Sequence, residues 1–166
     1  MQKKDVFFNN PTLGKKSLKR VVLELANFIK EEPGYFYHLV VGTDSQDHTD
    51  NGLSFLNLVS AIVVYREGRG GRYFWHKHKL PVSHSLREKI YRETLASLSL
   101  AQKLLPLLRQ KLNGDEYDLE IHIDVGNAGQ TRDMIKEVVA MVGGNGFKAK
   151  TKPESYGASS VADKYT

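Results

Sequence analysis

The sequence predicts an α/β protein of three layers, in which helices cover both faces of a five-stranded mixed sheet. Three consecutive strand-like segments with turn-rich connections indicate an antiparallel meander. Two later strand-like segments each follow a helical segment, so they need crossover connections and should run parallel to the first strand. The usual right-handed crossover then gives the strand order 3-2-1-4-5, with strands numbered along the chain.

Periodicity and turn residues locate the elements. The expected strands are 38–46, 53–67, 72–80, 117–126 and 147–152, with a polar loop at 47–52 between the first two. The expected helices are 17–31, capped by Ser17; 86–112, with a kink at Pro106; 131–142; and a terminal helix that opens with Ser159 or Ser160 as its cap. One domain over 1–166 follows, with a helical extension at 1–37 and the core at 38–166.

Length and composition limit the number of domains and the class of protein. A chain of 166 residues with 40% hydrophobic residues can bury one core and has little room for two. The N-terminus lacks the apolar stretch of a signal peptide, and no apolar run approaches the ~20 residues that span a bilayer. We therefore expect a cytoplasmic protein without membrane contact.

The chain contains no cysteine. This excludes disulfides, thiolate metal sites and cysteine nucleophiles, so any bound metal must have oxygen or imidazole ligands. Oxygen ligands favour Mg²⁺ or Mn²⁺.

The formal charge of +5 suits a polyanionic partner. Basic residues gather with aromatic ones in the third expected strand and the turn before it, and we expect Arg69, Arg72 and Lys77 to contact the phosphates of nucleic acid. The alternative is a solvated hairpin whose lysines protect an edge strand from aggregation.

Two aspartates lie at the carboxyl ends of expected strands. Asp44 ends the first strand in VVGTDSQ, and Asp124 ends the fourth in IHIDVG. These strands should be parallel neighbours, and ligands of such sheets bind outside the carboxyl ends of the strands. A strand-end aspartate is often a turn former or helix cap, but an adjacent pair favours a site.

Two further acids come from helices. Glu93 falls on the apolar stripe of the long helix with Leu86, Ile90, Ser97 and Leu100. It is either a buried acid, paired with an arginine or capped by a hydroxyl group, or a metal ligand aimed at Asp44. Asp163 is expected in the first turn of the terminal helix, where it can complement the helix dipole, or it completes a set of four acids.

The order of the motifs VVGTDSQ, RETLASLSLAQKL, IHIDVG and VADKY resembles that of the ribonuclease H-like superfamily. The segments VGTDSQ, HIDVGNAGQTR and KPESYGASSVADK resemble the bacterial YkuK family, and the resemblance extends from about residue 38 to the end. It implies a ribonuclease H-like fold. In that superfamily four acids hold two Mg²⁺ or Mn²⁺ ions, and the resemblance assigns both metal binding and catalysis to Asp44, Glu93, Asp124 and Asp163.

The expected function is therefore metal-dependent hydrolysis of nucleic acid by a two-metal-ion mechanism. The chain lacks an obvious basic helical protrusion, so RNA, DNA and hybrid substrates stay open, as does the oligomeric state. His48 and His84 are candidate proton shuttles, and His122 shares a strand face with Asp124.

Three other functions remain open. A non-catalytic nucleic-acid-binding or scaffold protein could keep this fold. The segment IDVGNAGQTRD also resembles a phosphate loop of the actin and sugar-kinase ATPases, but those enzymes close two such domains over ATP, and this chain supplies one. The third is hydrolysis of a small-molecule phosphodiester.

Overall fold

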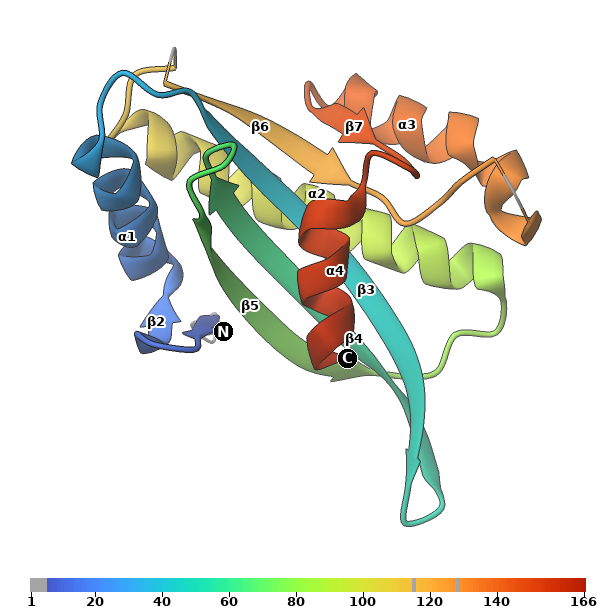
Figure 1. The fold of residues 1–166 in the computed structure, drawn as a ribbon. Coiled ribbons are helices and arrows are strands. Elements are labelled where there is room, and N and C mark those ends of the chain that lie inside the picture. Colours follow the sequence, from blue (N-terminus) through green and yellow to red (C-terminus); the bar gives the residue numbers. More distant parts are fainter. Residues whose placement is uncertain (1–5, 115, 128) are drawn as a thin grey trace.

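A computed structural model describes residues 6–114, 116–127 and 129–166 (Figure 1). The strands are β1 (Phe7–Asn10), β2 (Gly14–Ser17), β3 (Tyr37–Asp50), β4 (Leu53–Tyr65), β5 (Gly71–Leu80), β6 (Tyr117–His122) and β7 (Lys148–Lys150). The helices are α1 (Leu18–Glu31), α2 (Leu86–Arg109), α3 (Ile135–Gly144) and α4 (Tyr156–Tyr165), with a short 3₁₀ helix, η1, at Gly129–Met134.

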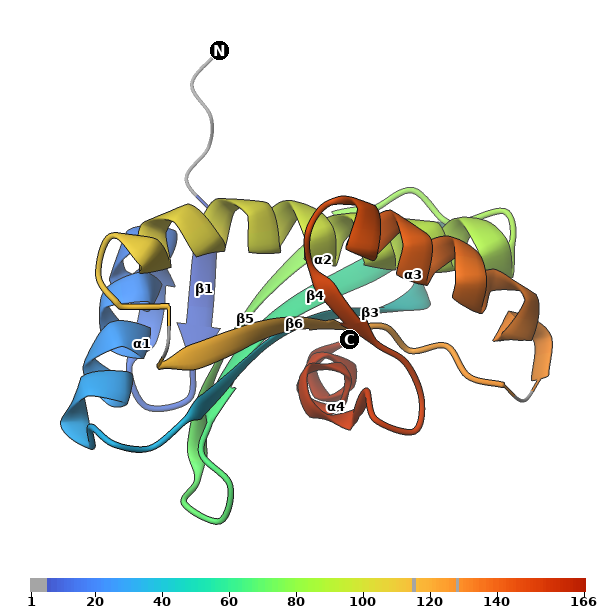
Figure 2. The same ribbon diagram turned by 90° about the horizontal axis from the view of Figure 1, so that it is seen from above.

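All strands belong to one mixed sheet between two helical layers. Figure 2 shows α2 and α3 on one face of the sheet and α4 on the other. The sheet order is β2-β1-β5-β4-β3-β6-β7, in which β3, β6 and β7 run parallel and the other pairs are antiparallel. None of the described helices is long and apolar enough to cross a membrane.

The sheet has seven strands and not the five predicted. The five expected segments are neighbours within it as β5-β4-β3-β6-β7, and the hairpin of β1 and β2 extends the sheet beyond β5. The N-terminal region is thus a hairpin followed by a helix rather than a helical extension. Strands of four residues are too short to show a pattern in the sequence. The hairpin is held to β5 by the buried side chain of Phe8 and by Asn10, which donates a hydrogen bond to the Tyr73 carbonyl (3.0 Å).

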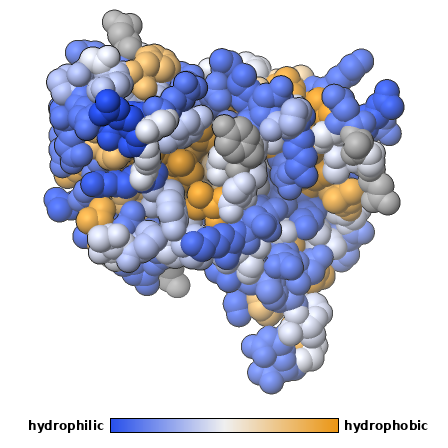
Figure 3. All heavy atoms as spheres, in the orientation of Figure 1, coloured by the Kyte–Doolittle hydropathy of each residue, from blue (hydrophilic) through white to orange (hydrophobic). Residues whose placement is uncertain are grey.

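The polar loop expected at 47–52 is also wrong. Strand β3 continues to Asp50, and Asn51 and Gly52 form a two-residue turn with positive φ angles of 50° and 78°, as tight hairpins require. Most side chains near this tip are exposed, so the strand carries no alternation of apolar residues. The hairpin projects from the body of the molecule (Figures 1 and 3).

Helix boundaries differ mainly near the C-terminus. The predicted helix at 131–142 is split into η1 and α3, whereas α2 continues through Pro106 to Arg109. Helix α4 begins at Tyr156, which makes Ser155 its N-cap instead of Ser159 or Ser160. Asp163 therefore lies in the last turn of α4 and not in the first. The predicted cap of α1 is confirmed, because the Ser17 hydroxyl accepts a hydrogen bond from the Arg20 amide (3.4 Å).

Helix α4 packs directly on the backbone of β3. A small apolar core of Val40, Val59, Ala61, Ala158 and Ala162 joins the helix to the sheet. A Cβ atom at Gly42 would lie only 2.8 Å from the Cβ of Ala158, so Gly42 permits this close approach. The approach fixes the position of α4, and with it the position of Asp163.

We expect Gly42→Ala to destabilise the protein by about 1–3 kcal/mol, because the added methyl group overpacks this contact. Gly143→Ala is the control: it lies in α3 with no atom within 4 Å of the added Cβ, and alanine favours a helix. Urea unfolding measures both free energies. Equal stability of Gly42→Ala and wild type would show that α4 does not depend on this contact.

Candidate functional site

The two strand-end aspartates lie where β3 loses one of its neighbours. Strand β6 pairs with β3 only as far as Gly42 and His122. Asp44 lies two residues beyond the last pair on β3, and Asp124 lies two residues beyond the end of β6. As predicted, the strands are parallel neighbours, so both acids stand at the same open edge of the sheet.

Glu93 reaches this edge from α2. It is 6% exposed, and its Oε1 accepts a hydrogen bond from the Ser45 hydroxyl (2.6 Å). Ser45 faces α2 and Asp44 faces the opposite side of the sheet, because side chains alternate along a strand. Among the described residues, the hydrogen-bond partner of Glu93 is thus a hydroxyl group, one of the two partners expected for a buried acid here, and not an arginine.

Two adjoining cavities bring the four acids around one hollow. A cavity of about 600 Å³ is lined by Asp44, Lys89, Glu93, Asp124, Thr131 and Lys152, among others. A second, of about 430 Å³, extends along α4 and is lined by Asp124, Lys152, Pro153, Ser155, Ser159, Ser160 and Asp163. Asp124, Lys152 and Pro153 line both cavities.

Asp163 is exposed in the last turn of α4. A negative charge is unfavourable at the C-terminal end of a helix, so the helix dipole gives no reason for an acid there. Its charge acts instead on Asp44 across the hollow.

Burial and mutual repulsion make the acids harder to ionise. Burial, followed by the charges of Asp163 and Asp124, raises the pKa of Asp44, while Lys89 opposes the rise. Burial raises the pKa of Glu93 to about 7, and Asp44 adds to this against the hydrogen bond from Ser45. Lys152 forms an ion pair with Asp124 (2.7 Å), which raises the pKa of the lysine.

Within the described part of the chain, no three Asp, Glu or His side chains come close enough together to form a metal-binding group. Each acid has a different environment. Glu93 accepts a hydrogen bond from Ser45, Asp124 forms an ion pair with Lys152, and Asp163 is exposed on α4. The donor set itself suits Mg²⁺ or Mn²⁺, since it consists of carboxylate oxygens. A cation at Asp124 must compete with the Lys152 ammonium group.

The three basic residues expected to bind phosphates do not meet at this hollow. Arg72 pairs with Glu24 of α1 (3.5 Å), and Arg69 lies 3.8 Å from Glu32. Lys77 donates to the carbonyl groups of Tyr165 and Thr166 (3.0 and 3.3 Å), beside the stacked rings of Trp75 and Tyr165. All three side chains contact helical or C-terminal segments of their own chain.

The cations that line the hollow are Lys89 and Lys152, and the sequence analysis missed both as site residues. Lys89 could have been found, since it precedes Glu93 by one helical turn on α2. Lys152 carried a weaker signal, because it follows the end of a three-residue strand.

None of the three candidate histidines is among the described residues that line the two cavities. The Nε2 atom of His48 lies 3.2 Å from the Thr166 carbonyl, and His84 is exposed before α2. His122 is 4% exposed and lies 3.3 Å from Glu120; burial lowers its pKa. None of the three is placed to transfer a proton at the acids in this structure.

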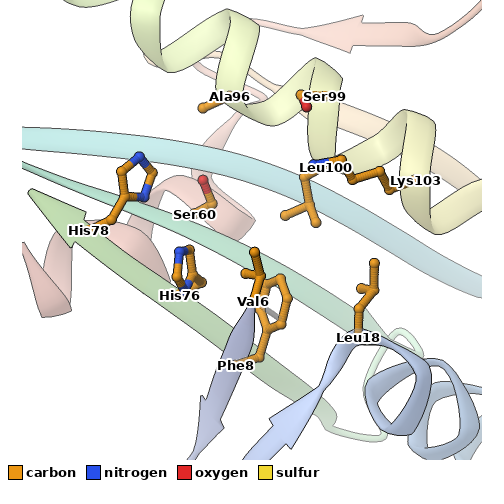
Figure 4. A pocket seen from close by; sticks show the side chains of 10 residues that line it. All are labelled: Val6, Phe8, Leu18, Ser60, His76, His78, Ala96, Ser99, Leu100 and Lys103. Atoms are coloured by element: carbon orange, nitrogen blue, oxygen red, sulfur yellow. The ribbon is translucent and has the colours of Figure 1, made fainter. Parts of the chain in front are cut away.

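A separate cavity of about 260 Å³ lies between α2 and the strands β1 and β5 (Figure 4). Its lining is mostly apolar, with His76 and His78 stacked at 5.3 Å. The Nδ1 atom of His76 is 2.9 Å from the Phe7 carbonyl, and burial lowers the pKa of His78. Among the residues that the structure describes, no acid lines this cavity, so it is separate from the acidic hollow.

Comparison with known proteins identifies the family of this chain. The family model described as Ribonuclease H-like matches residues 20–166. The chain belongs to the ribonuclease H-like family. It is also 32% identical over 170 residues to the "Uncharacterized protein YkuK" of Bacillus subtilis (strain 168), with 96% of each chain covered. No solved structure matches the protein. The resemblance inferred from the motifs is thereby confirmed.

We expect Glu93→Gln to stabilise the metal-free protein at pH 8 but not at pH 4. The folded state holds the Glu93 proton up to about pH 7, whereas the unfolded chain releases it near the ordinary glutamate pKa of 4.5. Wild type therefore loses stability as the pH rises through this window, by about 3 kcal/mol at most, and glutamine cannot ionise.

Urea unfolding in chelator at both pH values tests this. Glu31→Gln on the exposed face of α1 is the control and should unfold like wild type at both. A Glu93→Gln variant that is no more stable than wild type at pH 8 would contradict the expected burial cost of the charge.

Proposed function

We propose that the protein is a metal-dependent nuclease that hydrolyses the phosphodiester bonds of nucleic acid. The observation that carries the proposal is the arrangement of four acids from two strands and two helices around one hollow in a ribonuclease H-like chain. Buried and mutually repelling carboxylates are unfavourable unless a cation offsets their charge.

The acids Asp44, Glu93, Asp124 and Asp163 would hold two Mg²⁺ or Mn²⁺ ions. Such ions, when bound, activate a water molecule and neutralise the leaving oxygen of a phosphodiester. The Ser45 hydroxyl on β3 orients the Glu93 carboxylate by a hydrogen bond, and the burial of Glu93 keeps water from one side of the hollow. Lys89 and Lys152 bring positive charge to the place where a phosphate would enter.

The proposed substrate is a nucleic-acid strand, whether RNA, DNA or a hybrid. Lys89 and Lys152 are better placed to contact its phosphates near the acids than Arg69 and Arg72, which pair with Glu32 and Glu24. Lys77, Arg69 and Arg72 would add contacts away from the hollow, and these contacts act through the charge of the backbone rather than through the bases.

A second candidate function is non-catalytic binding of nucleic acid. The observation in its favour is the ion pair of Lys152 with Asp124, since a lysine that permanently replaced the cation would leave a basic surface without a metal centre. The two candidates differ in their response to Mn²⁺.

We expect millimolar Mn²⁺ or Mg²⁺ to stabilise the folded protein. An ion that binds only the folded state at about a hundredfold excess over its Kd adds about 2.7 kcal/mol, which for a chain of this size raises the Tm by roughly 5 to 10 °C. Thermal melting with Mn²⁺ and with chelator measures the shift. The double variant Asp44→Asn/Asp124→Asn should show none, and an equal shift in that variant would place the ion elsewhere.

We expect Asp44→Asn and Asp124→Asn each to lower Mn²⁺-dependent cleavage at least about a hundredfold while the protein stays folded, because asparagine keeps the shape and removes the charge. The test uses labelled single-stranded RNA, double-stranded DNA and an RNA/DNA hybrid. Asp50→Asn, exposed at the tip of the β3–β4 hairpin, is the matched control and should cleave like wild type.

Two outcomes would decide against the nuclease. Equal cleavage by wild type and both aspartate variants would remove these acids from the catalytic site. Binding without cleavage of any of the three substrates would favour the non-catalytic candidate.

A further inference from the structure

The cavity along α4 has two chemically different ends. Ser155, Ser159, Ser160 and Asp163 recur at the spacing of one helix face, and together they line the cavity with Lys152. Eight residues of helix separate Ser155 from Asp163, which corresponds to a distance of about 12 Å. The serine end lies at the start of the helix, and the acidic end lies beside Asp124.

Two hydroxyl groups at the serine end have no partner among the described residues. Ser155 is 2% exposed and Ser159 is 9% exposed, and neither Oγ atom makes a hydrogen bond within this part of the chain. Although Ser155 occupies the N-cap position, its side chain makes no capping bond. A buried hydroxyl left without a partner is unfavourable, so a ligand that offers acceptor oxygens would be stabilised here.

The charges at this end favour an anion. The first turn of α4 presents unpaired backbone amides and the positive end of the helix dipole. The Lys152 side chain is 59% exposed and lines both cavities, so its ammonium group can reach either one. Asp163 carries negative charge at the far end, which restricts an anion to the serine end.

We propose that this serine end is a phosphate subsite, and that it holds a phosphate group of the nucleic-acid strand next to the one cleaved at the acids. The proposal rests on the proposed function. Ser155, Ser159 and the α4 amides would donate to the phosphate oxygens. Lys152 would turn from Asp124 to the same phosphate when a cation takes its place at Asp124. Hydroxyl, amide and ammonium donors contact the strand backbone and select no base.

The subsite also gives the Lys152–Asp124 ion pair a function. In the metal-free protein the lysine balances the charge of Asp124. If Asp124 held a cation, the lysine would be repelled from that place, and the neighbouring phosphate would offer it the opposite charge. Lys152 would then act as a positioning residue that links the two cavities.

Inorganic phosphate is the probe for a first experiment, carried out in chelator with the whole chain. We expect phosphate to shift the backbone amide resonances of Gly157 and Ser159 with saturation in the millimolar range. Ser155→Ala/Ser159→Ala should weaken this binding at least tenfold. It should leave the Tm unchanged or higher, because it removes two unpartnered buried hydroxyls.

Ser97→Ala is the matched control. Ser97 is also buried, but its hydroxyl donates to Thr43 (2.8 Å) in the core beneath α2. This variant should bind phosphate like wild type and have a lower Tm. Phosphate affinity unchanged in the double serine variant would overturn the subsite.

A second experiment separates the subsite from the nuclease by measuring Mn²⁺-dependent cleavage of an oligonucleotide. If the subsite holds a strand phosphate, the double serine variant should show a KM about tenfold higher with little change in kcat. An unchanged KM, with phosphate binding lost, would overturn the assignment to the strand and leave a site for free phosphate. Loss of cleavage in Asp44→Asn together with an intact KM in the serine variant would support the nuclease and overturn only the assignment of the subsite to the strand.

Discussion

The early end of the pairing between β3 and β6 is the constraint on which the site depends. The two strands pair in parallel from Tyr37 to Gly42. The chain after β6 then separates from β3, although it still bonds to the β7 segment, while β3 continues beside β4. This opening allows Asp44 and Ser45, which point to opposite faces, to act on one hollow. It also lets Glu93 approach from the α2 layer. A longer β6 would close the edge and separate the acids by the thickness of the sheet.

The same edge receives α4 from the other face of the sheet. Gly42 is the last residue of β3 that pairs with β6, and the backbone of α4 packs against it at Ala158. Helix α4 therefore lies close enough to the sheet for the helix face that lines the second cavity to extend the hollow toward Asp163. The close approach leaves little room for side chains between helix and sheet, and the core there consists of alanines and valines.

Lysines around the hollow balance the negative charge of the acids, so the acids can lie near one another in the folded protein. Lys152 neutralises Asp124, Lys89 lowers the repulsion on Asp44 and Glu93, and burial keeps Glu93 protonated near neutral pH. In the proposed function a divalent cation would replace these contacts, since it would offer the carboxylates a stronger partner. Without a cation, the two lysines balance the charge of the acids.

The sequence by itself determined the family, the type of most elements and the adjacency of Asp44 and Asp124, because strand-end acids and periodic apolar residues are local signals. It did not predict the β1–β2 hairpin, which is too short to show a pattern, or the last-turn position of Asp163, which depends on where α4 begins. The partners of Arg69, Arg72 and Lys152 were decided only by the tertiary structure. Those partners lie on other elements, and a long charged side chain pairs with whichever acid the packing brings within its reach.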